Sequence, residues 1–422
     1  TQSRSSAASD VYKRQAREHA LAWKLASTVR VKEVYVAPGN AGTQAEDKVK
    51  NIHIGSESIN ELIAFCQQKA IDLTLVGPEA PLAAGIVDQF IAAGLKIFGP
   101  TRDAARLESS KHFAKEFMQR HKIPTVHFAV FNQVEEAKKY VYDKGVPIVI
   151  KADGLAGGKG VVVAENIPIA EQAIEQLLEG KHQKILIEDY LEGIEMSFIS
   201  IVDGEHILPL ATSHDYKRLH NHNRGPNTGG MGAYSPSYLM DDVLLHKIMS
   251  QIVEPTIQGM KAEGHTFQGF LYAGLMIDQH GNPRVIEFNC RLGDPETQAI
   301  LLRLEGDLSE ALVAACEQRL HKIKLEWSDK SAVAVVLAAQ NYPQHPKKGN
   351  YISGLDKAGD IAKVFHAGTR ETEEGIVTCG GRVLCVAALD EDMILARARA
   401  YQAVEVIHFD GMQYRDDIAA KK

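Results

Sequence analysis

Three polar side chains at alternate positions could together hold a metal ion and a phosphate. The segment RVIEFNCRLGDPE places Glu287, Asn289 and Arg291 two residues apart. In a β-strand these three would share one face, and Phe288 and Cys290 would take the other. Carboxylate and amide oxygens suit Mg²⁺ when phosphate and water complete its shell, and arginine can clamp a phosphoryl oxygen. A strand with its polar face in water would show the same pattern, so this segment alone does not decide.

A glycine-rich segment earlier in the chain could bind phosphate. Residues 147–164 read PIVIKADGLAGGKGVVVA, but a P-loop would need Ser or Thr after Lys159 and glycine in place of Asp153. A dinucleotide fingerprint would need glycine in place of Val163 and a helix after it. Both flanks are strand-like, so we expect a β-hairpin whose glycines form a flap over phosphates.

A second glycine-rich loop, GPNTGGMG at residues 225–232, could bring backbone amides close to an anion. A flexible surface loop would look similar, although a fully solvated loop has little use for Met231. Further along, the DPE at residues 294–296 reads most simply as a helix start. Asp294 would be its N-cap and Pro295 its first helical residue.

Different elements must position these groups. In the N-terminal quarter, short apolar strands run into Gly/Pro loops and alternate with helices, which is typical of an open parallel sheet. Ligands then lie near the loops at 38–42 and 77–81, although plain turn chemistry would explain the same residues. The middle of the chain combines helices with the flap hairpin and two antiparallel pairs, at 195–211 and 270–289. The last part, from Ser331, predicts a small α/β unit.

The composition of the chain limits the classes of function that are possible. A chain of 422 residues is long enough for two to four domains. The net charge of -7, from 47 basic and 54 acidic residues, gives no sign of nucleic-acid binding. No run approaches the roughly 18 apolar residues of a membrane span, so a cytoplasmic protein is expected. The five cysteines lack the spacing of a zinc site or a disulfide framework.

The order of these features resembles the glycinamide ribonucleotide synthetase family of ATP-grasp ligases. The resemblance runs from about Arg17 to the C-terminus through REHALAWK, VAPGNAGT, VGPEAPL, DGLAGGKG, GPNTGGMGAYSP, FNCRLGDPETQ, FHAGT and GGRVLCV. It implies an α/β protein with three parts. These are an open parallel-sheet N-terminal domain at 1–102, ATP-grasp α+β domains at 103–328 with a lid at about 124–192, and a small C-terminal α/β domain at 329–422.

The resemblance also implies ligand positions. Lys217 and Arg291 would steady the γ-phosphate as it moves, and Glu287 and Asn289 would bind Mg²⁺ or Mn²⁺. ATP would contact Lys111, Lys151, Gly154, Gly157, Gly158, Lys159, Gly160, Glu188, Asp189, Leu191 and Glu195. The other substrates would contact Gly77, Pro78, Glu79, Asn227, Thr228, Gly229, Gly230, Met231 and Gly232.

The implied reaction is an ATP-dependent ligation in purine biosynthesis. ATP would convert glycine to glycyl phosphate, and 5-phosphoribosylamine would attack it to give glycinamide ribonucleotide, ADP and phosphate. We expect a monomer with small-molecule substrates and with neither nucleic acid nor membrane as partner. Two alternatives stay open: another ATP-grasp ligase or carboxylase component, and an ATP-binding protein that no longer catalyses.

The first residues depart from the family pattern. The family begins with an apolar strand and a glycine-rich turn before the REHALAWK helix, whereas this chain has TQSRSSAASDVYKRQA. That segment has no run of β-formers and no glycine, so the first strand of the parallel sheet is expected to be missing. A helix N-terminus preceded by glycines is a natural phosphate cradle, so the site for the phosphate of phosphoribosylamine is expected to be impaired.

We therefore predict that the chain as written binds MgATP normally but needs strongly raised phosphoribosylamine, or fails to ligate. Replacing residues 1–16 with an apolar strand and a glycine-rich turn should restore ligation, measured as glycine-dependent ADP release against phosphoribosylamine concentration. Ordinary phosphoribosylamine dependence in the unaltered chain, with no change on replacement, would contradict this prediction.

Overall fold

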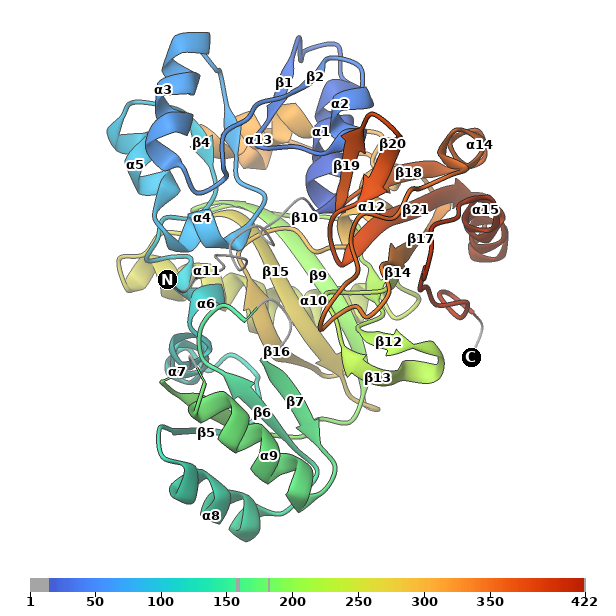
Figure 1. The fold of residues 1–422 in the computed structure, drawn as a ribbon. Coiled ribbons are helices and arrows are strands. Elements are labelled where there is room, and N and C mark those ends of the chain that lie inside the picture. Colours follow the sequence, from blue (N-terminus) through green and yellow to red (C-terminus); the bar gives the residue numbers. More distant parts are fainter. Residues whose placement is uncertain (1–14, 157–159, 181–182, 421–422) are drawn as a thin grey trace, which may run out of the picture.

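A computed structural model describes residues 15–156, 160–180 and 183–420 of the chain (Figure 1). The atypical segment before Gln15 and the flap residues Gly157, Gly158 and Lys159 lie outside the described residues. Among the described residues, no helix is both long enough and apolar enough to cross a membrane.

The N-terminal part contains two short parallel strand pairs. Strand β1 (Val34–Val36) pairs with β2 (Val49–Asn51), and β3 (Thr74–Leu75) pairs with β4 (Ile97–Phe98). The predicted β-α-β unit is therefore present, but among the described residues the two pairs do not join into one sheet. Helices surround them: α1 (Ala16–Ala26), α2 (Ala41–Ala45), α3 (Ile59–Lys69), α4 (Glu79–Ala83) and α5 (Ile86–Ala92).

The flap belongs to a four-stranded antiparallel sheet in the order β5-β8-β6-β7. Its strands are β5 (Phe128–Phe131), β6 (Ile148–Ala152), β7 (Val161–Ala164) and β8 (Ile185–Asp189). Helices α8 (Val134–Lys144) and α9 (Ile167–Leu178) pack on one face through Ile148, Ile150, Ile185 and Ile187. Because side chains alternate, Lys151 and Glu188 point from the other face into a cavity. The β6–β7 hairpin expected around the flap is confirmed.

A second antiparallel sheet forms the centre of the molecule (Figure 1). Its order is β10-β9-β15-β16, with β9 (Ile194–Asp203), β10 (Ile207–Pro209), β15 (Gln268–Ile277) and β16 (Pro283–Asn289). Both antiparallel pairs expected in the middle of the chain are therefore present. Helices α6 (Arg106–Ser109) and α7 (Lys111–Arg120) lie beside β16.

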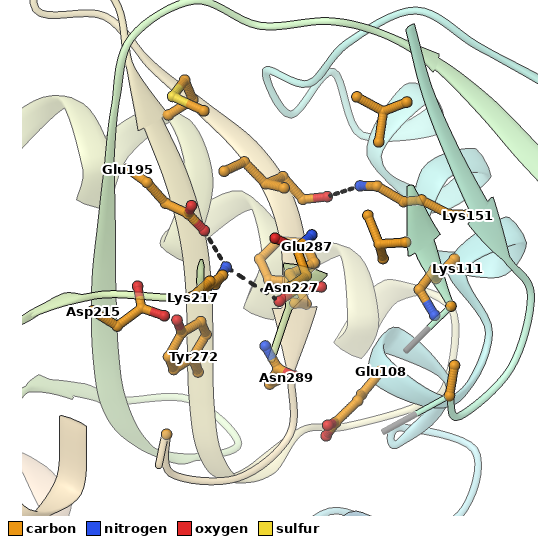
Figure 2. A pocket seen from close by; sticks show the side chains of 18 of the residues that line it. Glu108, Lys111, Lys151, Glu195, Asp215, Lys217, Asn227, Tyr272, Glu287 and Asn289 are labelled. Atoms are coloured by element: carbon orange, nitrogen blue, oxygen red, sulfur yellow. Dashed lines mark hydrogen bonds and ion pairs between the residues drawn. The ribbon is translucent and has the colours of Figure 1, made fainter. Parts of the chain in front are cut away.

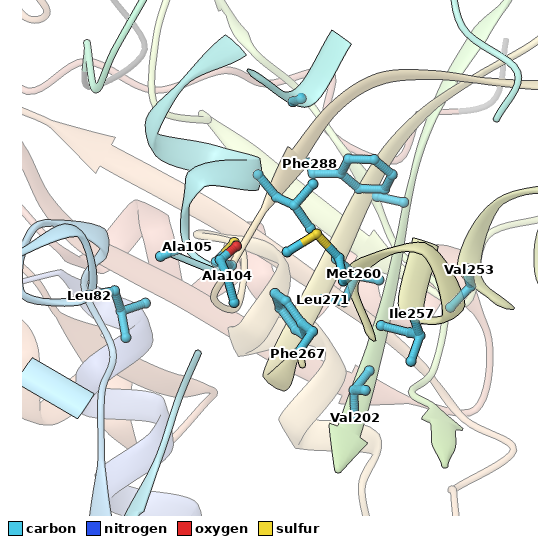
Figure 3. Packing of buried hydrophobic residues seen from close by; sticks show 14 of the residues in the cluster. Leu82, Ala104, Ala105, Val202, Val253, Ile257, Met260, Phe267, Leu271 and Phe288 are labelled. Carbon is cyan, nitrogen blue, oxygen red and sulfur yellow. The ribbon is translucent and has the colours of Figure 1, made fainter. Parts of the chain in front are cut away.

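The large core behind this sheet holds Phe267, Leu271 and Phe288 against Ile257 and Met260 (Figure 3). The last two lie on a long helical stretch that consists of three joined pieces. They are α10 (Asp242–Ile248), the π-helical turn η2 (Met249–Val253) and α11 (Glu254–Ala262). Pro255 explains the interruption, because it has no N–H to donate to the preceding turn.

The C-terminal part shares its sheet with the middle of the chain. The order is β11-β14-β17-β21-β18, and β11 (His214–Asp215) and β14 (Gly232–Ser235) precede the expected boundary near residue 328. The other strands are β17 (Ser331–Ala338), β18 (Lys363–His366) and β21 (Arg382–Asp390). Helices α12 (Glu296–Arg303) and α15 (Met393–Val406) contact this sheet. The domain boundary expected near residue 328 therefore falls between strands that belong to one sheet.

Smaller elements complete the described chain. They are β12 (Arg218–His220), η1 (Asn221–Asn223), β13 (Arg224–Asn227), α13 (Leu308–Cys316), η3 (Leu320–Lys322), α14 (Leu355–Gly359), β19 (Thr369–Thr372) and β20 (Gly375–Thr378). Strands β12 and β13 form a hairpin, and β13 includes the first three residues of the predicted GPNTGGMG loop.

Gly354, before α14, should be essential for packing α14 against α15. It has φ +83°, and a Cβ there would lie 1.8 Å from the carbonyl oxygen of Val406. We expect Gly354→Ala to lower the free energy of unfolding by about 3 kcal/mol or more. Gly349→Ala is the matched control, because Gly349 has φ +91° but no described atom lies within 4 Å of its Cβ. The control should lose only about 1 to 2 kcal/mol in urea unfolding, and equal losses would contradict the steric argument.

Candidate active site

A cavity of about 770 Å³ lies between the flap sheet and the central sheet (Figure 2). Its volume is that of a typical ligand site. The predicted positions that line it are Glu79, Lys111, Lys151, Gly154, Gly160, Glu188, Asp189, Leu191, Glu195, Lys217, Asn227, Thr228, Gly229, Glu287, Asn289 and Arg291. Residues far apart in the sequence thus meet in one place.

Two buried lysines share one buried carboxylate at the flap side of the cavity. Nζ of Lys151 lies 2.8 Å from Oε2 of Glu188, and Nζ of Lys115 lies 3.0 Å from the same oxygen. Burial opposes ionisation of Glu188, but Lys151 and Lys115 together hold its pKa below the usual value. Burial also lowers the pKa of Lys115 to about 8. The ion pairs hold Lys151 at the cavity wall.

Lys115 was not predicted from the sequence, although a signal for it exists. It follows Lys111 by four residues on α7, so both lysines lie on one face of the helix. Lys111 donates to the carbonyl oxygen of Gly154 at 2.9 Å, which ties α7 to the base of the flap. Burial lowers the pKa of Lys111. Helix α7 therefore presents two cationic side chains to the flap sheet.

Strand β16 carries the candidate metal ligands. Glu287 and Asn289 face the cavity, whereas Phe288 and Cys290 belong to the apolar core, as the alternation predicts. Burial would raise the pKa of Glu287, but Lys217 and the other nearby cations outweigh it and lower the pKa to about 2. The carboxylate is therefore ionised at neutral pH. Two hard oxygen ligands on adjacent same-face positions fit Mg²⁺ that takes its remaining ligands from phosphates and water.

Arg291 is held by several acceptors at the edge of the cavity. Its Nη2 donates to Oδ1 of Asn289 at 2.9 Å and lies 3.0 Å from Oε1 of Glu108. Its Nε lies 3.7 Å from Glu79, which also pairs with the buried Arg17 at 3.2 Å. Glu108 thus connects α6 to Arg291, and Arg17 connects α1 to it through Glu79, although neither was predicted from the sequence to belong to the site.

Lys217 stands between two carboxylates (Figure 2). It forms an ion pair with Glu195, and its Nζ lies 3.8 Å from Oε1 of Glu287. Burial would lower the pKa of Lys217, but Glu195, Asp215 and Glu287 outweigh it and raise the pKa well above the usual value. Lys217 therefore remains a cation throughout the physiological pH range.

The GPNTGGMG loop reaches the cavity with its middle residues Asn227, Thr228 and Gly229. The hydroxyl of Thr228 donates to the carbonyl oxygen of Lys217 at 2.8 Å and accepts from the N–H of Gly230 at 3.0 Å. Met231, by contrast, is fully buried beside Leu219, so its side chain is not available to a substrate. Gly232 lies in β14, paired with Val335.

Other predicted substrate positions lie behind the cavity wall. Gly230 packs its backbone against Pro295, where a Cβ would come within 2.5 Å of Cδ. Gly77 packs closely against the Glu18 side chain, and neither Gly77 nor Pro78 lines the cavity. Of the Gly77–Glu79 segment, Glu79 alone is a lining residue.

The helix start predicted at Asp294 is wrong by one position. Helix α12 begins at Glu296 with Pro295 as its N-cap residue. The Asp294 carboxylate instead accepts from Nε2 of Gln298 at 2.8 Å and pairs with Nη2 of Arg382 at 3.3 Å. A side chain of α12 itself and a distant arginine therefore use the oxygens that would otherwise cap the helix backbone.

Arg382 joins the C-terminal part to the glycine loop, which the sequence did not suggest. Its Nη1 donates to the carbonyl oxygens of Gly229 and Asp294, each at 2.6 Å. The arginine thus holds the loop against the start of α12. No local pattern in GGRVLCV marks it, because its partners come from other segments.

Comparison with known proteins agrees with this arrangement. The phosphoribosylglycinamide synthetase N domain, ATP-grasp (A) domain and C domain profiles match residues 11–108, 109–297 and 332–421. The phosphoribosylamine–glycine ligase of Neisseria meningitidis is 57% identical over 411 residues, covering 96% of this chain and 97% of that protein. This chain belongs to the phosphoribosylglycinamide synthetase family.

Solved structures give the same result. The phosphoribosylamine–glycine ligase of Thermotoga maritima superimposes with a TM-score of 0.80 at 36% identity, covering 96% of this chain and 98% of that one. Biotin carboxylase of Campylobacter jejuni shares the fold alone, with a TM-score of 0.68 at 19% identity over 94% of this chain and 91% of that one. The resemblance, the α/β fold class and the ATP-dependent ligase class are thereby confirmed, and the carboxylase alternative is set aside.

We predict that Arg382→Met destabilises the protein and weakens glycine binding. Removing the guanidinium leaves the buried Asp294 without its cation and should cost about 3 kcal/mol in urea unfolding. The KM for glycine should rise because the loop at Gly229 loses its support, while the KM for ATP stays near the wild-type value.

Arg399→Met is the matched control, since Arg399 is half exposed and pairs with Asp390 on the surface. It should change stability by less than about 0.5 kcal/mol. Equal effects of the two substitutions would contradict the role given to Arg382.

Proposed function

We propose that the chain joins glycine to 5-phosphoribosylamine with ATP, giving glycinamide ribonucleotide, ADP and phosphate. The observation that carries this proposal is the cavity in which buried lysines of the flap side face the carboxylate of β16 (Figure 2). Phosphoryl transfer needs both, because cations must hold the phosphates and oxygen ligands must hold the metal. The relatives from Neisseria meningitidis and Thermotoga maritima bear the name of this activity.

The chemistry explains why ATP is needed. A carboxylate is a poor acyl donor, because its oxygen would have to leave as oxide. One oxygen of glycine therefore bonds to the γ-phosphorus of ATP while the bond to ADP breaks. The amine of phosphoribosylamine then attacks the acyl carbon, phosphate leaves with the bonding electrons, and the nitrogen loses a proton. Water must be excluded in between, which gives the flap its function.

Different residues of the cavity have different roles in this reaction. Lys111 and Lys151 bind the phosphates of ATP, and the Glu188 ion pair keeps Lys151 in position. Lys217 remains charged and steadies the γ-phosphoryl oxygens during transfer, together with Arg291. All four cations are preorganised by partners on the protein.

Glu287 and Asn289 would hold Mg²⁺ or Mn²⁺. The ionised carboxylate and the amide oxygen beside it are suitable ligands, and Arg291 orients that amide through Oδ1. The bound metal would neutralise phosphate charge and orient the triphosphate.

The other predicted positions would contact the adenine and ribose of ATP, glycine and phosphoribosylamine. Asp189 and Leu191, at the end of β8, would border adenine, and Glu195 would exchange its ion pair with Lys217 for the ribose hydroxyls. Asn227, Thr228 and Gly229 would lie near glycine, and Glu79 would face the phosphoribosylamine. We further propose a cytoplasmic monomer divided near residues 102 and 328.

The proposal is tested by ADP release with Glu287→Ala. Wild-type protein should release ADP only with glycine and phosphoribosylamine together, and bicarbonate should not replace glycine. Glu287→Ala should lower kcat at least about a hundredfold, because it removes the carboxylate of the metal pair. Calorimetry should show that the variant loses the gain in ATP affinity that Mg²⁺ provides.

Glu317→Ala is the control, because that carboxylate lies on the surface and pairs with Lys96. It should leave both measurements unchanged. Normal turnover of Glu287→Ala at saturating Mg²⁺ would reject the metal assignment, and bicarbonate-dependent ADP release would reject the proposed reaction.

A further inference from the structure

Asp215, at the end of β11, has a buried oxygen that nothing in the described chain satisfies. The residue is 9% exposed and lines the cavity beside Tyr272 and Lys217 (Figure 2). Among the described residues, its Oδ1 has no hydrogen-bond partner. Leaving a buried polar acceptor unpaired is costly, so such an oxygen is typical of a site that a ligand completes.

The neighbouring donors are already engaged. The hydroxyl of Tyr272 lies 2.8 Å from Oγ of Ser197, and Ser197 donates to Oε1 of Glu296 at 3.1 Å. Since Ser197 has one proton and uses it on Glu296, Tyr272 donates its own to Ser197. The ammonium group of Lys217 pairs with Glu195 and approaches Glu287. Neither neighbour donates a hydrogen bond to Oδ1 of Asp215 within the described chain.

The local charge favours a cationic ligand. Lys217 is one positive charge that faces the carboxylates of Glu195, Asp215 and Glu287. Burial raises the pKa of Asp215 well above its usual value, the carboxylates of Glu296, Glu195 and Glu287 raise it further, and Lys217 opposes them. A cation placed against Asp215 would relieve this excess of negative charge.

The cation is better matched by an ammonium group than by a second metal ion. Among the residues that the structure describes, no group of three or more His, Cys, Asp or Glu side chains could hold a metal. An ammonium group, by contrast, needs few acceptors and donates in several directions.

We propose that Asp215 binds the ammonium group of the glycine substrate, with Oδ1 accepting one of its N–H hydrogens. This inference rests on the proposed function. Lys217, two residues further along the chain, would then lie on the side of the glycine carboxylate that is phosphorylated. Binding to Asp215 also keeps the glycine nitrogen protonated, so it cannot attack an acyl phosphate in place of the phosphoribosylamine nitrogen.

The test compares glycine with glycolate, which has a hydroxyl group in place of the ammonium group. Wild-type protein should use glycolate at least about a hundredfold less well in kcat/KM, measured by phosphoribosylamine-dependent ADP release. Asp215→Asn keeps the size but removes the charge, so it should lower kcat/KM for glycine far more than for glycolate. The preference for glycine should fall about a hundredfold, with the KM for ATP unchanged.

Asp203→Asn is the matched control. Asp203 is also buried, but its Oδ1 accepts from the N–H groups of Glu205 and His206, and its Oδ2 accepts from Leu320. Any loss in that variant should affect both substrates equally and leave the preference unchanged.

Two results would overturn the inference while the proposed function stands. One is wild-type protein that uses glycolate as well as glycine, a measurement that needs no variant. The other is Asp215→Asn with both substrates lowered equally, as expected if Asp215 acts on phosphoribosylamine or only on the fold. Wild-type protein without glycine-dependent ADP release would instead overturn the proposed function, and this inference with it.

Discussion

The ionised, half-buried carboxylate of Glu287 is the feature on which the rest of the site depends. Its pKa is held at about 2 against burial because lysines from three separate segments and Arg291 surround it. Removing one charged side chain from this cluster would leave the remaining charges without their counter-charge. The flap sheet, the central sheet and helix α7 must therefore keep fixed relative positions, and their extensive apolar cores provide that rigidity.

The cations of the cavity are held by carboxylates that the proposed ligands would partly replace. Lys217 pairs with Glu195, and Arg291 pairs with Glu108. These ion pairs lower the cost of keeping the cations buried before phosphate arrives. Asp215 differs, since its Oδ1 has no such partner within the described chain. The contrast separates groups that are charge-balanced by the protein from one that we expect the substrate to balance.

The C-terminal part is also structurally continuous with the site. Strand β14 pairs with β17, and Arg382 of β21 reaches the carbonyl oxygens of Gly229 and Asp294. A segment remote from the flap and the metal strand in sequence thus holds the loop that would border glycine. The position of that loop follows from sheet pairing together with the close approach of Gly230 to Pro295.

The sequence by itself determined the elements whose signals are local. Period-two alternation placed Glu287 and Asn289 on one face of β16, and strand-like flanks identified the β6–β7 hairpin. The order of the motifs was enough to identify the family and to predict most of the positions that line the cavity. Local patterns nevertheless misplaced the start of α12, and the motif resemblance placed the buried Met231 among the substrate contacts, because neither carries information about distant partners.

Only the tertiary structure decided which charges meet. Arg382 and Lys115 act through residues up to 153 positions away, and no spacing along the chain encodes such contacts. The unpartnered Oδ1 of Asp215 is likewise visible only in the folded protein. The same holds for the sheet shared across residue 328, since pairing of β14 with β17 depends on complementary strand edges. Burial is the physical reason why the sequence determined some of these features and only the tertiary structure decided the others. It changes the pKa and the pairing of a side chain only when segments from elsewhere in the chain exclude water from it.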